Sequence, residues 1–185
     1  PAKVVALVQN NKEVSEVSEG EFFVIFDQTP FYGESGGQIG DHGYISNNQF
    51  KAKISDTKKP VPHLFVHQAK IESGSLKVSD QVQLNVDRKM RLPTMQNHSA
   101  THIMHSALQK ILGDHVRQAG SLVTDQNLRF DFSHFEAVSP EQIKEIENQV
   151  NEVILANLEI EKVEMAYDDA IAKGAIAFFG DKYGD

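Results

Sequence analysis

The chain has 185 residues, 40% hydrophobic and 24% charged, which is ordinary for a globular protein and enough for one large or two small domains. No apolar run approaches the ~20 residues that a membrane span needs, and the absence of cysteine excludes disulfides and favours a cytoplasmic location. Residues 1–135 hold 14 acidic and 14 basic side chains, so the net charge of −8 arises later, and any nucleic-acid contact must rely on local basic groups.

The first 88 residues have the pattern of a β-rich domain. Short apolar or alternating runs predict strands at residues 4–8, 22–26, 51–55 and 81–86, and turn-forming residues separate them. Several short strands at this spacing predict a small β-barrel subdomain over residues 1–88.

A glycine-rich loop at residues 29–41 follows the second predicted strand. It lacks the Gly-Lys-Ser/Thr of a P-loop, and no long helix follows it as in a dinucleotide-binding fingerprint. Its glycines permit positive φ and a close approach of the backbone to a ligand. A tightly folded barrel loop explains them equally well, so both interpretations stay open.

The next predicted element is a helix over residues 91–112 that ends at Gly113. His98 and His102 are four residues apart on one face of this helix, a spacing that suits a single metal ion, and His105 extends the same stripe. The pair lacks the Glu of a His-Glu-x-x-His signature, and a catalytic zinc needs a third ligand, so two ordinary polar residues are an alternative. Basic residues flank the helix and either contact phosphate or are solvated charges: Arg88, Lys89, Arg91, Lys110 and Arg117.

Residues 89–185 are predicted to form an antiparallel sheet with helices on one face, so the fold class is α+β with a domain boundary at residues 87–92. A hairpin is expected at residues 115–124 and 128–132. The next helix begins at Ser139, with Pro140 at its first position and Gln142 completing a capping box. A strand at residues 160–165 and a short helix at 168–173 follow.

Five stretches occur in an order that resembles the editing domain of bacterial-type alanyl-tRNA synthetase over essentially the whole chain. They are Phe-Tyr-Gly-Glu-Ser-Gly-Gly-Gln at 31–38, Asn-His-Ser-Ala-Thr-His at 97–102, Gln-Ala-Gly-Ser at 118–121, Leu-Arg-Phe-Asp-Phe-Ser-His at 128–134 and Lys-Gly-Ala-Ile-Ala-Phe-Phe-Gly at 173–180. Because the chain begins at Pro1 without a methionine, we expect a fragment of a larger protein.

The resemblance implies a β-barrel subdomain followed by an editing core of the kind shared with threonyl-tRNA synthetase. The implied reaction is hydrolysis of the mischarged esters Ser-tRNA(Ala) and Gly-tRNA(Ala), with the tRNA(Ala) acceptor end and the other domains of the parent synthetase as partners, and neither membrane nor DNA. The implied cofactor is zinc, held by His98 and His102 together with a Cys and a His of a later Cys-x-x-x-His motif beyond Asp185.

The resemblance also implies roles for residues near the substrate. These are Gln118 and Thr101 as catalytic residues and Ser35, Gly36, Gly37 and Gln38 as substrate-binding residues. His105 is expected to support the site or the fold rather than to bind metal.

Three alternatives remain open. The chain is a tRNA acceptor-end binding fragment that is catalytically silent without its missing ligands, a free-standing trans-editing protein, or an unrelated metal-dependent hydrolase. A Cys-x-x-x-His motif within the next few dozen residues would support the editing domain.

Overall fold

The computed structural model describes residues 1–161 and 163–175. They form two compact units: residues 1–102 with 119–131, and residues 103–118 with the described residues after 131. The chain thus returns to the first unit after leaving it. The predicted division into residues 1–88 and 89–185 stays a prediction.

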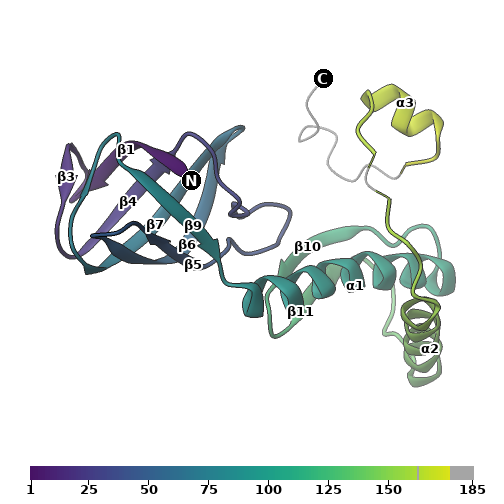
Figure 1. Cartoon of the computed structure of the whole chain (residues 1–185). Helices are drawn as coiled ribbons and strands as arrows, with labels where there is room; N and C mark the ends of the chain where they lie inside the picture. The colour runs from purple at the N-terminus through teal and green to yellow at the C-terminus, as the bar shows by residue number, and fades with distance from the viewer. Residues whose placement is uncertain (162, 176–185) are drawn as a thin grey trace. The chain divides into compact units, whose positions relative to one another are not determined.

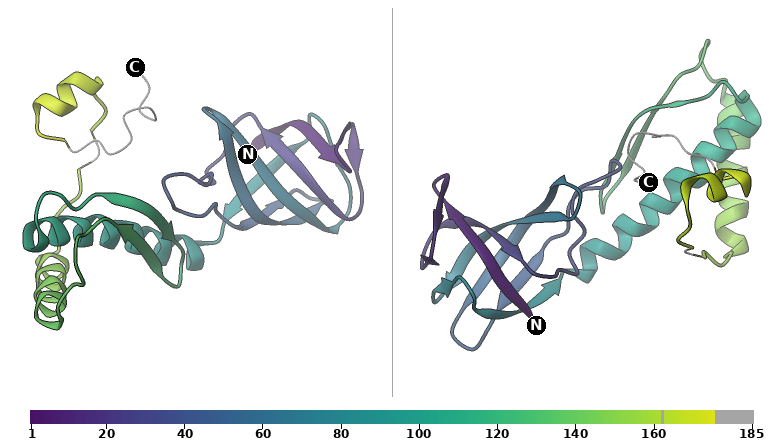
Figure 2. Two further views of the ribbon diagram at one scale, coloured as in Figure 1. Left: turned by 180° about the vertical axis from the view of Figure 1, so that it is seen from behind. Right: turned by 90° about the horizontal axis from the view of Figure 1, so that it is seen from above.

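The first unit is built on a seven-stranded sheet whose order is β2-β1-β4-β7-β6-β5-β9 (Figures 1 and 2). All of its neighbouring strands are antiparallel, and β1 also pairs with β9 through Ala2↔Val82 and Lys3↔Gln81. The strands are β1 (Ala2–Gln9), β2 (Lys12–Val14), β4 (Glu21–Phe26), β5 (Gly43–Ser46), β6 (Lys51–Val61), β7 (Leu64–Ser73) and β9 (Gln81–Val86). A separate pair joins β3 (Glu16–Val17) to β8 (Leu76–Lys77).

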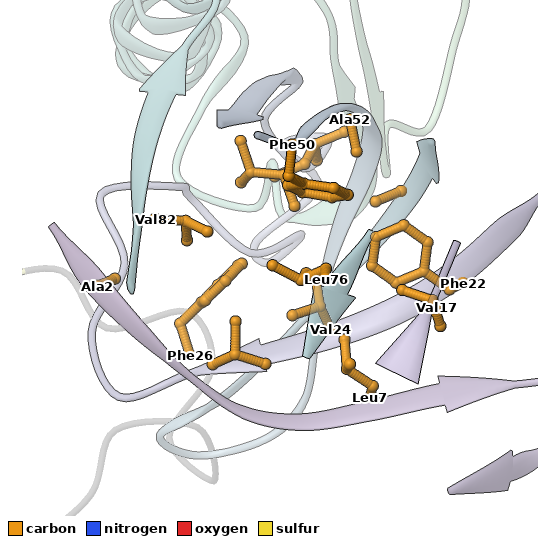
Figure 3. Close-up of a cluster of buried hydrophobic side chains, with 14 of the residues drawn as sticks. Ala2, Leu7, Val17, Phe22, Val24, Phe26, Phe50, Ala52, Leu76 and Val82 are labelled. Carbon is orange, nitrogen blue, oxygen red and sulfur yellow. The ribbon is translucent and has the colours of Figure 1, made fainter. Parts of the chain in front are cut away.

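The core of the first unit is a cluster of buried hydrophobic side chains, most of them from this sheet and from β3 and β8 (Figure 3). Side chains alternate between buried and exposed along β1 and β4, because successive residues of a strand point to opposite faces. Val4, Val24 and Ile54 are completely buried, and burial of such a side chain contributes about 1.5–3 kcal/mol. The loop at residues 29–41 therefore extends from a sheet with a well-packed core.

The four predicted strands of this unit are confirmed, although β6 continues to Val61 beyond the predicted end at residue 55. Three strands of the sheet were not predicted: β2, which has only three residues, β5 and β7. β5 has only four residues, and β7 has a fully buried histidine, His67, at a position where the pattern of a strand calls for an apolar residue. The structure has a large antiparallel sheet in these residues, and closure into a barrel stays a prediction. The antiparallel sheet predicted for residues 89–185 has two strands among the described residues, β10 (Gln118–Val123) and β11 (Leu128–Phe132).

The long helix α1 (Arg88–Leu112) begins three residues before its predicted start. Asp87 precedes it, and its Oδ1 accepts a hydrogen bond from the N–H of Lys89, which satisfies one of the free donors at the helix start. The predicted stop is confirmed: Gly113 has a φ of +115° and donates its N–H to the Gln109 carbonyl. No helix among the described residues is long and apolar enough to cross a membrane.

The remaining elements follow the predicted order with one exception. The hairpin strands β10 (Gln118–Val123) and β11 (Leu128–Phe132), the helix α2 (Pro140–Ala156) and the short helix α3 (Tyr167–Ala172) are present, and Ser139 and Gln142 form the predicted capping box. The strand predicted at residues 160–165 is wrong, because the described residues of that range form no strand. Residues 176–180, which end the last motif, lie outside the described residues.

Candidate functional site

The glycine-rich loop closes on itself in a tight turn. Ser35 donates its N–H to the Gln38 carbonyl at 3.2 Å, and Gln38 donates back to the Ser35 carbonyl at 3.0 Å. Between them Gly36 and Gly37 have φ values of +59° and +83°. Two consecutive positive φ values are typical of the two-residue turns that favour glycine, so both glycines have a conformational reason.

This turn lies against the hairpin of the first unit. The Gly37 carbonyl accepts from Val123 N–H at 2.8 Å, and Ile39 N–H donates to the Val123 carbonyl at 3.1 Å. A Cβ atom on Gly37 would come within 2.7 Å of the Ser121 carbonyl oxygen, whereas one on Gly36 would meet nothing within 4 Å. Gly37 therefore permits contact with β10, and the open side of the turn is at Gly36.

The end of the loop is fixed by a buried ion pair. The Asp41 carboxylate, only 5% exposed, accepts from Arg91 Nε at 2.8 Å and from Tyr32 N–H at 2.7 Å. Arg91 also donates to the Pro30 carbonyl at 2.8 Å. Because its guanidinium is committed to the loop, Arg91 anchors the start of α1 rather than presenting a charge to phosphate.

The start of the loop is fixed by a neutral histidine. His67 on β7 donates Nδ1–H to the Val24 carbonyl at 3.1 Å, and the Thr29 hydroxyl donates to its Nε2 at 2.8 Å. The rings of Phe26 and Phe31 pack edge-on against it. Burial lowers the pKa of His67 to about 4, so the imidazole is uncharged at neutral pH.

His98 and His102 lie together on α1, as the sequence predicts. Their rings are nearly parallel, at 14°, with centroids 5.2 Å apart. His98 Nδ1–H donates to Gln38 Oε1 at 2.6 Å, which leaves His98 Nε2 as a lone-pair donor. Burial, followed by the neighbouring His102, lowers the pKa of His98 and favours its neutral, metal-binding form.

Gln38 has a clear structural role in this arrangement. Its side chain is 4% exposed and contacts His98, although the two residues are 60 positions apart in the sequence. Metal-binding histidines usually donate their second ring N–H to such an acceptor, which fixes the tautomer and the ring orientation. The geometry therefore favours Gln38 as a residue that positions His98, while its predicted role in substrate binding stays a prediction.

The other predicted residues lie around this centre or elsewhere on the fold. Thr101 is buried and donates its hydroxyl proton to the Asn97 carbonyl at 2.8 Å, so any contact with substrate would use its oxygen as an acceptor. Ser35 is exposed on the turn. Gln118 is the first residue of β10 and belongs to the second unit, whereas the other predicted site residues belong to the first. His105 is buried.

Two anchoring residues had no predicted role. Asn97 Nδ2 donates to the Thr124 carbonyl at 2.9 Å and ties α1 to the hairpin, and Asp41 binds Arg91 as described. The sequence signal that could have identified Asn97 was its position next to His98 in the recognised motif. Asp41 gave no signal, because an aspartate after glycine is typical of any turn.

The two histidines fit half of a zinc site. Each offers an imidazole nitrogen, and a neutral imidazole is a preferred zinc ligand. Within residues 1–161 and 163–175, no group of three or more His, Cys, Asp or Glu side chains could hold a metal ion. Any additional protein ligand therefore has to come from outside the described residues.

The comparison with protein families finds a match in the first part of the chain. Residues 1–90 match the sequence profile of the family "tRNA synthetases class II (A)".

Comparison of the whole chain finds similarity to alanine--tRNA ligases. The chain is 49% identical over 185 residues to the alanine--tRNA ligase of Thermoanaerobacter sp. (strain X514), 51% over 185 residues to that of Pseudomonas fluorescens and 50% over 183 residues to that of Halorhodospira halophila. These matches cover 98–100% of the chain and 21% of each relative. The chain is thus homologous to about a fifth of an alanine--tRNA ligase.

Proposed function

We propose that the chain is the editing region of an alanine--tRNA ligase and hydrolyses the ester of Ser-tRNA(Ala) and Gly-tRNA(Ala) in the cytoplasm. The proposal rests mainly on one contact, between His98 and Gln38, which links two of the recognised motifs. Its support is the pair of stacked imidazoles, the identity of about half of all residues to alanine--tRNA ligases, and the five motifs in family order.

The need for such a reaction follows from the chemistry of the amino acids. Serine differs from alanine by one hydroxyl and glycine by one methyl. A methyl group discriminates by only ~1–3 kcal/mol, and an apolar pocket rejects an added hydroxyl poorly. A second, hydrolytic site corrects the errors that remain.

The proposed fold of the site combines a barrel formed by the seven-stranded sheet of the first unit with an editing core that begins at α1. Zinc bound by His98 and His102, and by a later Cys-x-x-x-His motif, would supply Lewis acidity for the attack of water on the ester. Gln38 holds the His98 tautomer, and the turn at Ser35, Gly36 and Gly37 presents backbone to the substrate. Thr101 and Gln118 are proposed to contact the aminoacyl group.

The test uses the full-length protein that contains this chain and Ser-tRNA(Ala) as substrate. We expect His98→Ala to abolish deacylation and to lower the zinc content of the protein. Gln38→Ala should lower zinc affinity about 10–100-fold, because it removes the partner that orients His98. His63→Ala is the matched control, since His63 is an exposed histidine in the β6–β7 turn. If the unaltered protein leaves Ser-tRNA(Ala) charged, the proposal is wrong.

A second candidate function is binding of the tRNA acceptor end without hydrolysis by the isolated chain. It is favoured by the donor set of the described residues, in which two histidines stand without a third metal-binding side chain. Comparing the 185-residue chain with the full-length protein separates the two. Full deacylation by the short chain would contradict the assignment of further ligands to a later segment.

A further inference from the structure

The rings of His115 and Phe135 stack in the second unit, the His134 ring lies beside them, and none of the three has a role in the site described above. His115 lies between α1 and β10, while His134 and Phe135 follow β11. The His115 and His134 rings are 5.1 Å apart at 15°, and the His115 and Phe135 rings are 4.6 Å apart at 26°. A hydrogen bond of 2.9 Å joins His115 Nε2 to His134 Nδ1 and fixes the two imidazoles.

The outer ring of this stack is open to solvent. Phe135 is 87% exposed, more than any other large hydrophobic side chain among the described residues. His134 Nε2, beside this stack, is buried without a hydrogen-bond partner in the described part of the chain. An exposed phenyl ring gains little from burial, so packing among the described residues does not account for the place of Phe135. Most of the Phe135 ring is open to solvent, and a flat ligand can stack on it.

A positive charge lies beside the stack. Arg117 is two residues from His115, and its guanidinium donates to the carbonyls of Asp114 and Val116. Its backbone N–H donates to Ser133 Oγ, which precedes His134, so the two segments are joined at this point. The Arg117 side chain is exposed and makes no ion pair with a described carboxylate.

The geometry points to a single-stranded binding site in which an unpaired nucleobase of the tRNA 3′ end stacks on Phe135 and a backbone phosphate contacts Arg117. An aromatic face binds any base, and a neighbouring cation binds the backbone; together they are the usual chemistry of single-stranded nucleic-acid sites. His115 positions Phe135 by stacking on one face of it, and the hydrogen bond between His115 and His134 holds the His115 ring. This inference rests on the proposed function, because that function supplies the tRNA.

The first test measures stacking directly in the full-length protein. A tRNA(Ala) whose unpaired 3′ adenine is replaced by 2-aminopurine is titrated, and its fluorescence is followed. We expect quenching on binding that is lost in Phe135→Ala and kept in Phe135→Tyr, because tyrosine retains the ring. Leu155→Ala is the matched control, since Leu155 is 83% exposed in the same unit and lies in no stack.

The second test separates the ring from the charge. Phe135→Ala should raise KM for Ser-tRNA(Ala) about tenfold with little change in kcat, consistent with the loss of one base–aromatic contact. Arg117→Gln should lower the slope of log Kd against log salt by about one, as expected for one lost phosphate contact. Since both side chains are exposed, thermal unfolding should be unchanged.

The outcomes distinguish the inference from the proposed function. Quenching and KM that are the same in Phe135→Ala and in the unaltered protein would overturn the inference while leaving hydrolysis intact. An equal loss in Leu155→Ala would also overturn it, because it would show that this surface packs against protein. If the unaltered protein quenches 2-aminopurine through Phe135 but does not hydrolyse Ser-tRNA(Ala), the stacking site stands and the proposed function fails.

Discussion

The two units bury their apolar side chains to very different extents. In the first, residues from eight strands cover one another, and Leu7, Ile45 and Leu76 have no exposed surface. In the second, α2 buries only Ile146, while Ile143 and Ile154 are about half exposed and Leu155 is 83% exposed. An amphipathic sequence thus predicts a helix correctly without saying which surface will cover its apolar side.

The candidate metal centre therefore belongs to the unit with the better packed core, and the aromatic stack belongs to the unit with the less packed one. His98 and Gln38 belong to the unit with the completed core, whereas His115 and Phe135 belong to the other. Substitutions in the first unit should therefore be costly, and comparable ones in the second should be nearly silent.

The largest expected effect is that of Phe22→Ala in the core of the first unit. Phe22 is 2% exposed, and deletion of such a ring costs about 3–5 kcal/mol because a cavity remains. Leu155→Ala in the second unit should change stability by less than ~0.5 kcal/mol. Urea unfolding of both variants measures the contrast, and equal losses would contradict it.

The next effect concerns the anchor of the loop. Arg91→Ala should cost about 3 kcal/mol, because it leaves the buried Asp41 carboxylate without its partner. Arg129→Ala is the matched control: its partner Asp131 is exposed, and such pairs contribute ~0–1 kcal/mol. Urea midpoints that shift equally for the two arginines would show that burial of the pair is unimportant.

The third effect is a dependence of stability on pH. The pKa of His67 is about 4 in the folded chain and ~6.5 when unfolded, so the unfolded state binds the proton more readily. The contribution is complete above pH ~6.5 and falls as the pH drops toward 4, by at most about 3 kcal/mol. Denaturation midpoints from pH 7 to 4 measure it. His67→Gln should flatten this part of the curve, and an unchanged slope would contradict the assignment.

The smallest effect tests the second unit locally. Ser139→Ala removes the capping bond to Gln142 N–H and should cost about 1 kcal/mol. Hydrogen exchange should increase in the first turn of α2 and stay constant in β1 and β4. Ser106→Ala, an exposed serine within α1, is the control and should not weaken its helix. Faster exchange in β1 would contradict a local effect.

Local patterns predicted the elements well where the signal lay within a few residues. The start of α2 followed from Ser139, Pro140 and Gln142, and the end of α1 followed from Gly113. β7 was missed because His67, a polar residue, occupies a buried strand position that only the surrounding phenyl rings and two hydrogen bonds make acceptable.

The sequence predicted the residues of the candidate site but not the contacts between them. The spacing of His98 and His102 sufficed to place both rings on one side of a helix. The contact between His98 and Gln38 depends on how the loop packs against α1, which no local pattern specifies. The strand predicted at residues 160–165 failed because apolar alternation needs a neighbouring strand to pair with.

The segment that holds Gln38 has two tethers of unlike chemistry. At Thr29 the tether is an uncharged imidazole that acid would protonate, and at Asp41 it is a fixed pair of opposite charges. Acidification toward pH 4 should therefore protonate His67 and weaken the tether at Thr29, whereas substitution of Arg91 should weaken the tether at Asp41. Acid and the substitution of Arg91 thus affect the position of Gln38 from opposite ends of the loop.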